Sequence, residues 1–458
     1  MSLAAMCWWT MVRSVVLCLL AWPVCLVIER SLKRLSDSLQ FQMLVCLLAP
    51  VCFPELLVGY SLRDYALARP RWAEALCSVF LLVRMIPVGT IALLAAPRSS
   101  LDAAAIHCRW LLNQGRSGSW HQRIELARCY WHGPIMTALP ALALMSIVAF
   151  QEFEMAALLQ TISWTDWFVA AQRLGLEQNE MLRKSLWPIL WQLPVLIGVM
   201  RWLQTSTGQT DQASDDGAGA DRKTLWTGIF CVLLLVILGC LIPIKLIGWR
   251  TIEGLSLLLR QHSQQWGLAS EIVTSGAVAV CAGMSAWTIS GLGKAIAVNG
   301  SFLGLFGSLL LSLGCVAVFQ QSWFHWLYDT PFPWVLTLTI WLLPRAAILR
   351  LWLHALRNDE AAHVAQLVKR PGSQRQLLWR LRDQPRFLAA SLLCYWAYCD
   401  LPTAYMLAPT GMASGLVRLY NFMHYGRSSA LSAEACVFFG APVVLVSLLF
   451  ASLRWWRD

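Results

Sequence analysis

The segment Arg84-Met85-Ile86-Pro87 is followed, after an apolar stretch, by Leu101-Asp102-Ala103-Ala104. The second half of the chain contains a similar pattern, which runs from Leu343-Pro344-Arg345 to Asp359-Glu360-Ala361-Ala362. In each copy an apolar helix with an internal proline leads to an acid and two alanines, then to a basic loop and another apolar helix. The acid follows the proline by 15 positions in the first copy and by 16 in the second. Two copies with nearly the same spacing predict two related halves in tandem.

The composition around these stretches is that of a membrane protein. The chain has 458 residues, of which 58% are hydrophobic and 13% are charged, and its mean hydropathy is +0.56. Apolar runs of about 18 residues or more recur along the whole length, and each is long enough to span a bilayer as a helix. The runs are too long and too continuous for the strands of a membrane β-barrel. We therefore expect an all-α, polytopic membrane protein in contact with the lipid bilayer.

Charge and cysteine usage exclude several other classes of protein. The net charge of +11 comes from Lys and Arg that collect in loops between spans, as the positive-inside bias predicts, so we expect no nucleic-acid partner. The 15 cysteines lie mostly inside apolar spans and show no zinc-type spacing with each other or with histidine. We therefore expect no metal site, no cofactor and no catalytic residue in this chain.

The spans are expected to number about eleven, within a range of 10–12. The first half, 1–204, contains five of them, and the second half, 225–458, contains six. Between them, 205–224 is rich in Ser, Thr, Gly, Gln, Ala and Asp, which predicts a flexible cytoplasmic linker. The predicted spans lie near 7–28, 40–61, 73–97, 134–156, 185–204, 225–248, 271–292, 300–319, 333–355, 386–408 and 433–455.

The orientation of the halves follows from their loops. The loops 98–132 and 356–384 are both rich in Arg and Lys, which assigns both to the cytoplasm. The two proline-bearing spans before them then cross the membrane in the same direction. The halves are therefore predicted to be parallel repeats, related by an axis along the membrane normal. By this count the N-terminus lies outside, and its first apolar run is a retained span.

Two acids continue the repeat beyond the loops. Glu152 precedes Pro194 by 42 positions, and Asp400 precedes Pro442 by 42. Each acid lies near the predicted outer end of a span. An acid within a span is costly to bury and is a candidate for the transport pathway, although a carboxylate near the membrane surface can also simply reach water.

The repeated stretch also has a mechanical interpretation. The acids Asp102 and Glu360 suit the N-terminus of a short surface helix, either as ordinary caps or as the start of a helix that receives a partner protein. The alanines after them keep one face small, so that another protein surface can approach closely. Pro87 and Pro344 are candidate hinges, with plain packing as the alternative.

These loops resemble those of the permease subunits of binding-protein-dependent ABC importers. That family has Glu-Ala-Ala, three residues, Gly, and about thirteen residues to a Pro in a cytoplasmic loop. Glu360-Ala361-Ala362 matches the start, and Pro385 follows Gly372 by 13 positions, but nine residues separate Ala362 from Gly372. In the first half, Asp102-Ala103-Ala104 is the corresponding start.

The resemblance is to the branch with two fused permease halves, the ferric-iron and thiamine type. Leu327-Tyr328-Asp329-Thr330-Pro331 resembles the helix before the coupling loop of that branch, and 416–426 resembles its external segment. The resemblance implies an import channel in a bacterial inner membrane, working by alternating access. A periplasmic binding protein would deliver the substrate, with ferric iron as the first expectation and thiamine or another small solute as alternatives. This chain has no phosphate-binding loop motif, so a separate ATPase subunit would bind the ATP. Two copies of that subunit would dock on the two cytoplasmic loops.

Three other classes remain open at this point. A secondary transporter with parallel repeats would need no ATPase and would carry ion-coupling acids in the middle of the membrane. An integral-membrane enzyme would need converging His, Asp or Cys residues, which the spacing does not indicate. A divergent or inactive permease would also account for the irregular loops.

Overall fold

The structure is a computed structural model that describes 2–95, 136–206, 222–260, 262–355, 376–412, 414–426 and 428–455, together with Trp120 and Ile124. Throughout this part of the chain the regular structure is helical, which confirms the all-α prediction. Up to the predicted linker the main helices are α1 (Leu3–Leu32), α2 (Asp37–Cys52), α3 (Glu55–Ala68), α4 (Pro70–Ala95), α7 (Met136–Phe150), α8 (Glu154–Leu159), α9 (Trp164–Arg173) and α10 (Gln178–Ser206).

The chain continues after the predicted linker, of which 207–221 lies outside the described residues. The later elements are α11 (Arg222–Val236), the π-helical turn η2 (Ile237–Leu241), α12 (Ile242–Arg260), α13 (His262–Leu292), α14 (Lys294–Gly304), α15 (Ser308–Phe319), α16 (His325–Tyr328), α17 (Pro331–Ala355), the π-helical turn η3 (Trp379–Asp383), α20 (Gln384–Tyr398), α21 (Leu401–Leu407), α22 (Gly415–Tyr425) and α23 (Ser429–Trp455).

Six helices among the described residues are long and apolar enough to cross a membrane. A seventh is added if α2 and α3, which meet at a bend of 62°, count as one broken span. The class of multi-pass helical membrane protein therefore stands. The six helices are Leu3–Leu32, Pro70–Ala95, Arg222–Arg260, Trp266–Leu292, Pro331–Leu353 and Ser429–Arg454.

The expected count of about eleven spans is not confirmed, because several apolar runs are interrupted. The run near 300–319 breaks at Gly307, whose φ of +91° is in the left-handed region that favours glycine. The run near 386–408 breaks at Asp400, between α20 and α21. The run near 134–156 ends as a helix at Phe150, and α10, which covers 185–204, is less apolar than the six spans.

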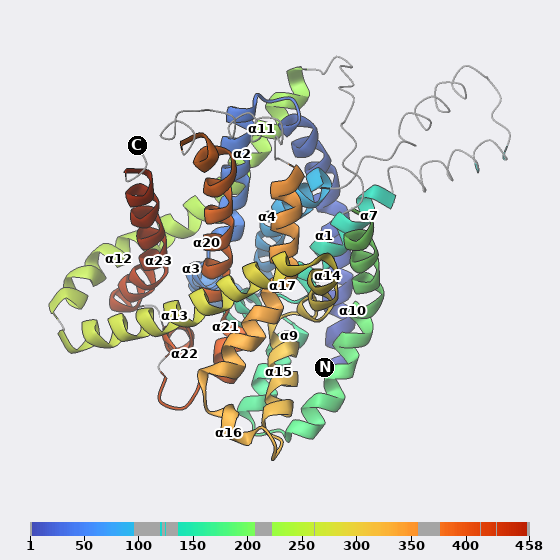
Figure 1. Ribbon diagram of the computed structural model, residues 1–458. Coiled ribbons are helices and arrows are strands. Elements are labelled where there is room, and N and C mark those ends of the chain that lie inside the picture. The colour runs from blue at the N-terminus through green and yellow to red at the C-terminus, as the bar shows by residue number, and fades with distance from the viewer. Residues whose placement is uncertain are drawn as a thin grey trace.

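Most helices run between two opposite ends of the molecule, so that their own ends gather there (Figure 1). The C-terminal ends of α1, α4, α10, α17 and α23 lie at the upper end of the view, together with the N-terminal ends of α2, α7, α11 and α20. The lower end holds α16 and the junction of α9 with α10. The described residues that flank 96–135, 207–221 and 356–375 are therefore all at one end of the molecule.

Neighbouring helices pack in a recurring arrangement. α1 packs against α4 and α7, and α13 packs against α17 and α20. The short helix α8 packs on α3, and the short helix α21 packs on α15. The largest core cluster joins apolar side chains from both parts of the chain, from Leu3 to Phe439, so the two parts share one interior.

Helix α3 connects the first part of the chain to its C-terminal end. The Tyr60 hydroxyl lies 3.2 Å from Ser432 Oγ, across 372 positions of sequence. The Arg63 guanidinium donates to the backbone carbonyl of His424, across 361 positions. Both α3 side chains are buried, Tyr60 completely and Arg63 with 9% exposure.

Two long helices, α12 and α23, approach closely at Gly254 in α12. A Cβ atom at this position would lie 1.8 Å from the carbonyl oxygen of Ser429, at the start of α23. Only glycine allows two backbones to come this close, which is the usual reason for small residues at helix contacts in membranes. Gly248, on the same helix, has open space where its Cβ would be.

Candidate functional site

The residues predicted for the coupling loops fall mostly outside the described part of the chain. Those outside it are Asp102, Ala103, Ala104, Glu360, Ala361, Ala362 and Gly372. Pro385 is described, and it is the second residue of α20, directly after the π-helical turn η3. Because proline has no backbone N–H, Pro385 cannot donate a hydrogen bond back to the preceding π-helical turn η3.

Glu152, the first of the two predicted pathway acids, caps the short helix α8. Its carboxylate accepts hydrogen bonds from the backbone N–H of Met155 and from that of Ala156, the latter at 3.1 Å. The backbone carbonyl of Glu152 accepts from Thr165 Oγ1 at 2.7 Å, which ties the acid to the start of α9. Glu152 is only 4% exposed, so it does not reach the surface of the described structure.

Asp400, the second predicted acid, has the corresponding role at α21. Its Oδ2 accepts from the backbone N–H of Thr403 at 3.0 Å, and the residue is 6% exposed. Each predicted acid is therefore a buried cap on a short buried helix, where a carboxyl oxygen accepts from N–H groups of the first turn that have no partner within the helix. Their role in a pathway stays a prediction.

A third acid joins these two short helices. Glu154, the first residue of α8, accepts a hydrogen bond through Oε1 from the backbone N–H of Leu401, the first residue of α21, at 3.3 Å. The two residues are 247 positions apart in the sequence. Because Glu154 is 6% exposed, this contact is an internal connection between the two parts of the chain.

Two arginines provide the opposite charge. Arg84, in α4, forms a 2.6 Å ion pair with Glu55 and donates to the Phe53 carbonyl at 2.9 Å, at the bend between α2 and α3. Arg345, in α17, interacts electrostatically with Asp400 and Glu55. We call these six charged residues the central charge cluster: Glu55, Arg84, Glu152, Glu154, Arg345 and Asp400.

The predicted hinge prolines lie beside these arginines. Pro87 is one helical turn after Arg84 in α4, and Pro344 directly precedes Arg345 in α17. Pro344 is in close contact with α14, because a Cβ at Gly304 would lie 2.5 Å from the proline Cδ. A charged residue inside an apolar span was the signal available in the sequence for both arginines.

A contact between an arginine and two tyrosines links α9 with α21 and α22. Arg173, at the end of α9, donates through Nε to the Tyr405 hydroxyl at 2.9 Å. Its guanidinium lies 5.5 Å from the ring centres of both Tyr405 and Tyr420, within cation–π range. With the Glu154–Leu401 and Arg63–His424 contacts, this is a further connection between the first part of the chain and α21 and α22.

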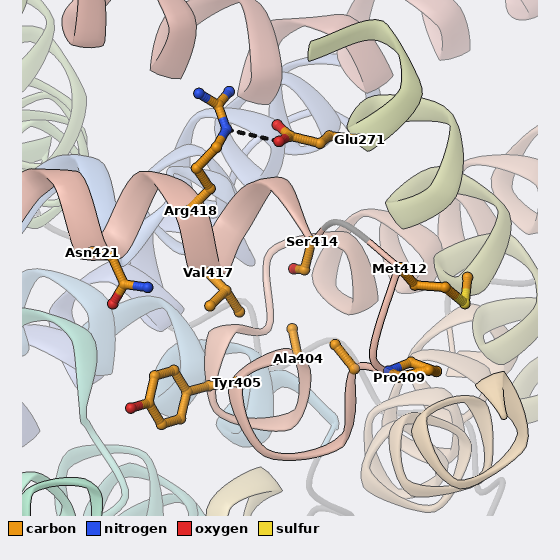
Figure 2. Close-up of a pocket in the computed structure, with 10 residues that line it drawn as sticks. Glu271, Ala404, Tyr405, Pro409, Met412, Ser414, Val417, Arg418 and Asn421 are labelled. Carbon is orange, nitrogen blue, oxygen red and sulfur yellow. Dashed lines mark ion pairs between the residues drawn. The ribbon is translucent and has the colours of Figure 1, made fainter. Parts of the chain in front are cut away.

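A pocket of about 400 Å³ lies between α13, α21 and α22 (Figure 2). Arg418 forms ion pairs beside it, with Glu271 Oε1 at 2.7 Å and with Glu434 Oε2 at 2.9 Å. The other lining residues are Ala404, Tyr405, Ala408, Pro409, Met412, Ser414, Val417 and Asn421. No sequence pattern indicated this pocket.

A hydrogen-bonded contact fixes the loop beside this pocket. Asp329, between α16 and α17, accepts from the backbone N–H of Thr410 at 2.8 Å and from its hydroxyl at 2.7 Å. These hydrogen bonds stabilise the charged carboxylate, so they lower the pKa of Asp329 below its ordinary value near 4. The contact therefore holds above that ordinary pKa and weakens as the pH falls through the lowered pKa.

The Asp329→Asn variant should test this pH dependence. At neutral pH we expect the Thr410 amide to exchange hydrogen faster in the variant than in the native chain. The difference should begin to shrink as the pH falls below about 4, where the carboxyl of the opened loop takes up a proton, and it should vanish as the pH falls through the lowered pKa of the native carboxyl. Exchange measured by mass spectrometry from pH 3 to 7 gives the profile, with Glu177→Gln as the control at the same end of the molecule. A difference that is constant over this range would contradict the assignment.

Within the described ranges there is no group of three or more His, Cys, Asp or Glu side chains that could hold a metal ion. Comparison with protein-family models, with curated proteins and with solved structures gives no match.

Proposed function

We propose that this chain is the membrane-spanning permease subunit of an ATP-driven importer, built from two tandem parallel halves. Substrate would arrive from a binding protein on the outside of a bacterial inner membrane, with ferric iron as the first expectation. Two copies of a separate ATPase subunit would dock on the loops at 98–132 and 356–384. The chain would pass the substrate by alternating access and would have no catalytic residue of its own.

The helix ends that flank the two predicted coupling loops lie on the same side of the molecule, and this is the main support for the proposal. They are the C-terminal ends of α4 and α17 and the N-terminal ends of α7 and α20 (Figure 1). A pair of ATPase subunits needs both loops on one side, because nucleotide-driven closure must move both halves together. An arrangement with the loops at opposite ends would have ruled this out.

The order and packing of the helices support the tandem halves. In the first part, α1, the broken pair α2–α3 and α4 precede α7, the short helices α8 and α9, and the long helix α10. In the second part, α13, the broken pair α14–α15 and α17 precede α20, the short helices α21 and α22, and the long helix α23. α11 and α12 would then be the additional segment that makes six predicted spans in one half against five in the other.

Purification with bound partners tests the proposal directly. We expect the tagged chain, extracted in a mild detergent from its source cells, to carry an ATPase subunit at about two copies per chain, counted by mass spectrometry. A chain that is recovered without any ATPase, while a known importer from the same extract retains its own, would overturn the proposal.

Reversing the charge at the predicted start of the second coupling helix should release the ATPase. We expect Glu360→Lys to lower ATPase recovery at least tenfold while leaving membrane insertion intact, because lysine opposes the positive end of the helix dipole. Glu177→Lys makes the same change at the opposite end of the molecule and is the matched control. Equal ATPase recovery from the two variants would rule out the assigned role of Glu360.

One observation favours a second candidate, a secondary transporter with parallel repeats. The acids Glu152, Glu154 and Asp400 are buried together and come from both parts of the chain, and buried acids of this kind serve as ion-coupling sites in such transporters. Uptake of labelled ferric iron separates the two candidates. Depletion of the ATPase should abolish uptake by an importer, whereas collapse of the proton and sodium gradients should abolish uptake by a secondary transporter.

A further inference from the structure

The pocket beside Arg418 has an excess of negative charge. Glu271 and Glu434 both form ion pairs with the single guanidinium of Arg418, so the three groups together carry one net negative charge. Glu271 and Glu434 are 5% and 6% exposed, which limits the screening of that charge by water. The charge beside Glu271 therefore favours a cation on that side of the pocket, whereas the positive charge of Arg173 lies at the hydroxyl of Tyr405, another lining residue.

Two of the residues that line the pocket each carry a buried oxygen atom without a hydrogen-bond partner in the described structure. The two atoms are Glu271 Oε2, whose companion oxygen is engaged by Arg418, and Ser414 Oγ, on a residue that is 8% exposed. A buried polar atom without a partner is unfavourable, so such atoms are usually satisfied by water, an ion or a ligand. Both atoms accept hydrogen bonds, and so does the side-chain carbonyl of Asn421 across the pocket.

The remaining lining selects against a bare, strongly hydrated ion. Val417, Ala404, Met412 and Pro409 supply apolar surface around the polar atoms (Figure 2). A pocket with apolar walls and a few convergent acceptors is typical of an organic ligand with one polar group. A primary ammonium has three N–H donors and one positive charge, which matches the acceptors and the net charge.

We propose that this pocket binds a small primary ammonium group, held by Glu271 and Ser414. The site goes beyond the proposed transport function and lies away from the central charge cluster. Two kinds of ligand carry a primary amine on a short carbon chain: a free small amine and the headgroup of an ethanolamine lipid. A quaternary ammonium would bind less well, because it has no N–H to donate to Glu271 Oε2 or Ser414 Oγ.

Titration of the full chain in detergent micelles tests the free amine. We expect saturable binding of ethanolamine at one site per chain, measured by calorimetry, and at least tenfold weaker binding of choline and of ethylene glycol. Glu271→Gln keeps the shape of the side chain and removes its charge, so it should raise the Kd at least tenfold. Ser414→Ala should raise the Kd severalfold.

Glu434→Gln is the matched control, because Glu434 also pairs with Arg418 but does not line the pocket. Glu434→Gln removes the same unit of charge from the field but no acceptor of a residue that lines the pocket, so it should raise the Kd clearly less than Glu271→Gln does. Equal losses in the two variants would mean that both act only through the net charge or by placing Arg418, and would overturn the proposal.

Lipid nanodiscs distinguish the two sources. Native mass spectrometry of the chain released from mixed bilayers should show ethanolamine lipid retained over choline lipid if the headgroup is the occupant, and Glu271→Gln should abolish the preference. Binding of free ethanolamine without that preference identifies a soluble amine. If neither ethanolamine nor its lipid is preferred over the choline and neutral controls, water fills the pocket and the proposal is wrong.

Discussion

Arg84→Met should lower the free energy of unfolding by about 3 kcal/mol. The substitution removes the cation that pairs with Glu55 at 2.6 Å and that also interacts with the buried Glu154. Loss of one partner from a buried ion pair lowers stability by about 3–5 kcal/mol, because the other charge is left without compensation. We expect the lower end of that range, since the Glu55 side chain retains 24% exposure. Unfolding in a graded mixture of mild and denaturing detergent gives the measurement.

A substitution on the same helix separates this effect from the general loss of a charge. Arg71, also in α4, is exposed, and Arg71→Met should change the free energy of unfolding by less than about 0.5 kcal/mol. The loss in free energy of unfolding in the double variant Arg84→Met/Glu55→Gln should be smaller than the sum of the two single losses by about 1 kcal/mol or more, because the two groups interact. Strict additivity would mean that the pair does not contribute to stability.

Gly254→Val should be comparably harmful, by separating α12 from α23. The added Cβ would lie 1.8 Å from the Ser429 carbonyl oxygen, which is a backbone atom and cannot move aside as a flexible side chain would. Overpacking of a close helix contact lowers stability by about 1–3 kcal/mol, and we expect the upper end here. The same detergent unfolding experiment measures the loss.

Gly248→Val is the matched control for this contact. It lies on the same helix and makes the same chemical change, but its Cβ would meet no atom within 4 Å. Valine forms helix slightly better than glycine, so the control should be neutral or more stable by a few tenths of a kcal/mol. Similar losses in both variants would show that valine harms α12 itself and that the contact with α23 is not the cause.

The sequence predicts the helical class and the membrane character well, because apolar composition is summed over long runs. It predicts the number of crossings less well, because the residues that interrupt a run are few. Pro54 precedes the 62° bend before α3, and Gly307 and Asp400 each separate two helices within one apolar run. Hydropathy averages hide such breaks, since proline, glycine and an occasional acid also occur in continuous spans.

The candidate site divides in the same way. The equal spacing of Glu152 and Asp400 singled out two residues that are both buried caps of short helices. Arg84 and Arg345 were part of the quoted patterns, but the sequence does not show that their charges meet acids from other helices. Glu154 was missed because its partner, Leu401, lies 247 positions away. Which faces of distant helices meet is determined by packing, and local periodicity carries no record of it.

Two contacts of α3 can form only after nearly all of the chain has been synthesised. Tyr60 and Arg63 bind residues that follow them by 372 and 361 positions. At roughly 5–20 residues per second, a ribosome needs about 20 to 70 s to make that intervening length. During this interval the Arg63 guanidinium lies in or near the bilayer without its final acceptor. Helix α3 is therefore made early but reaches its final contacts late. Premature termination anywhere before His424 therefore removes the acceptor of Arg63, so the final contacts of this early segment depend on translation of the last part of the chain.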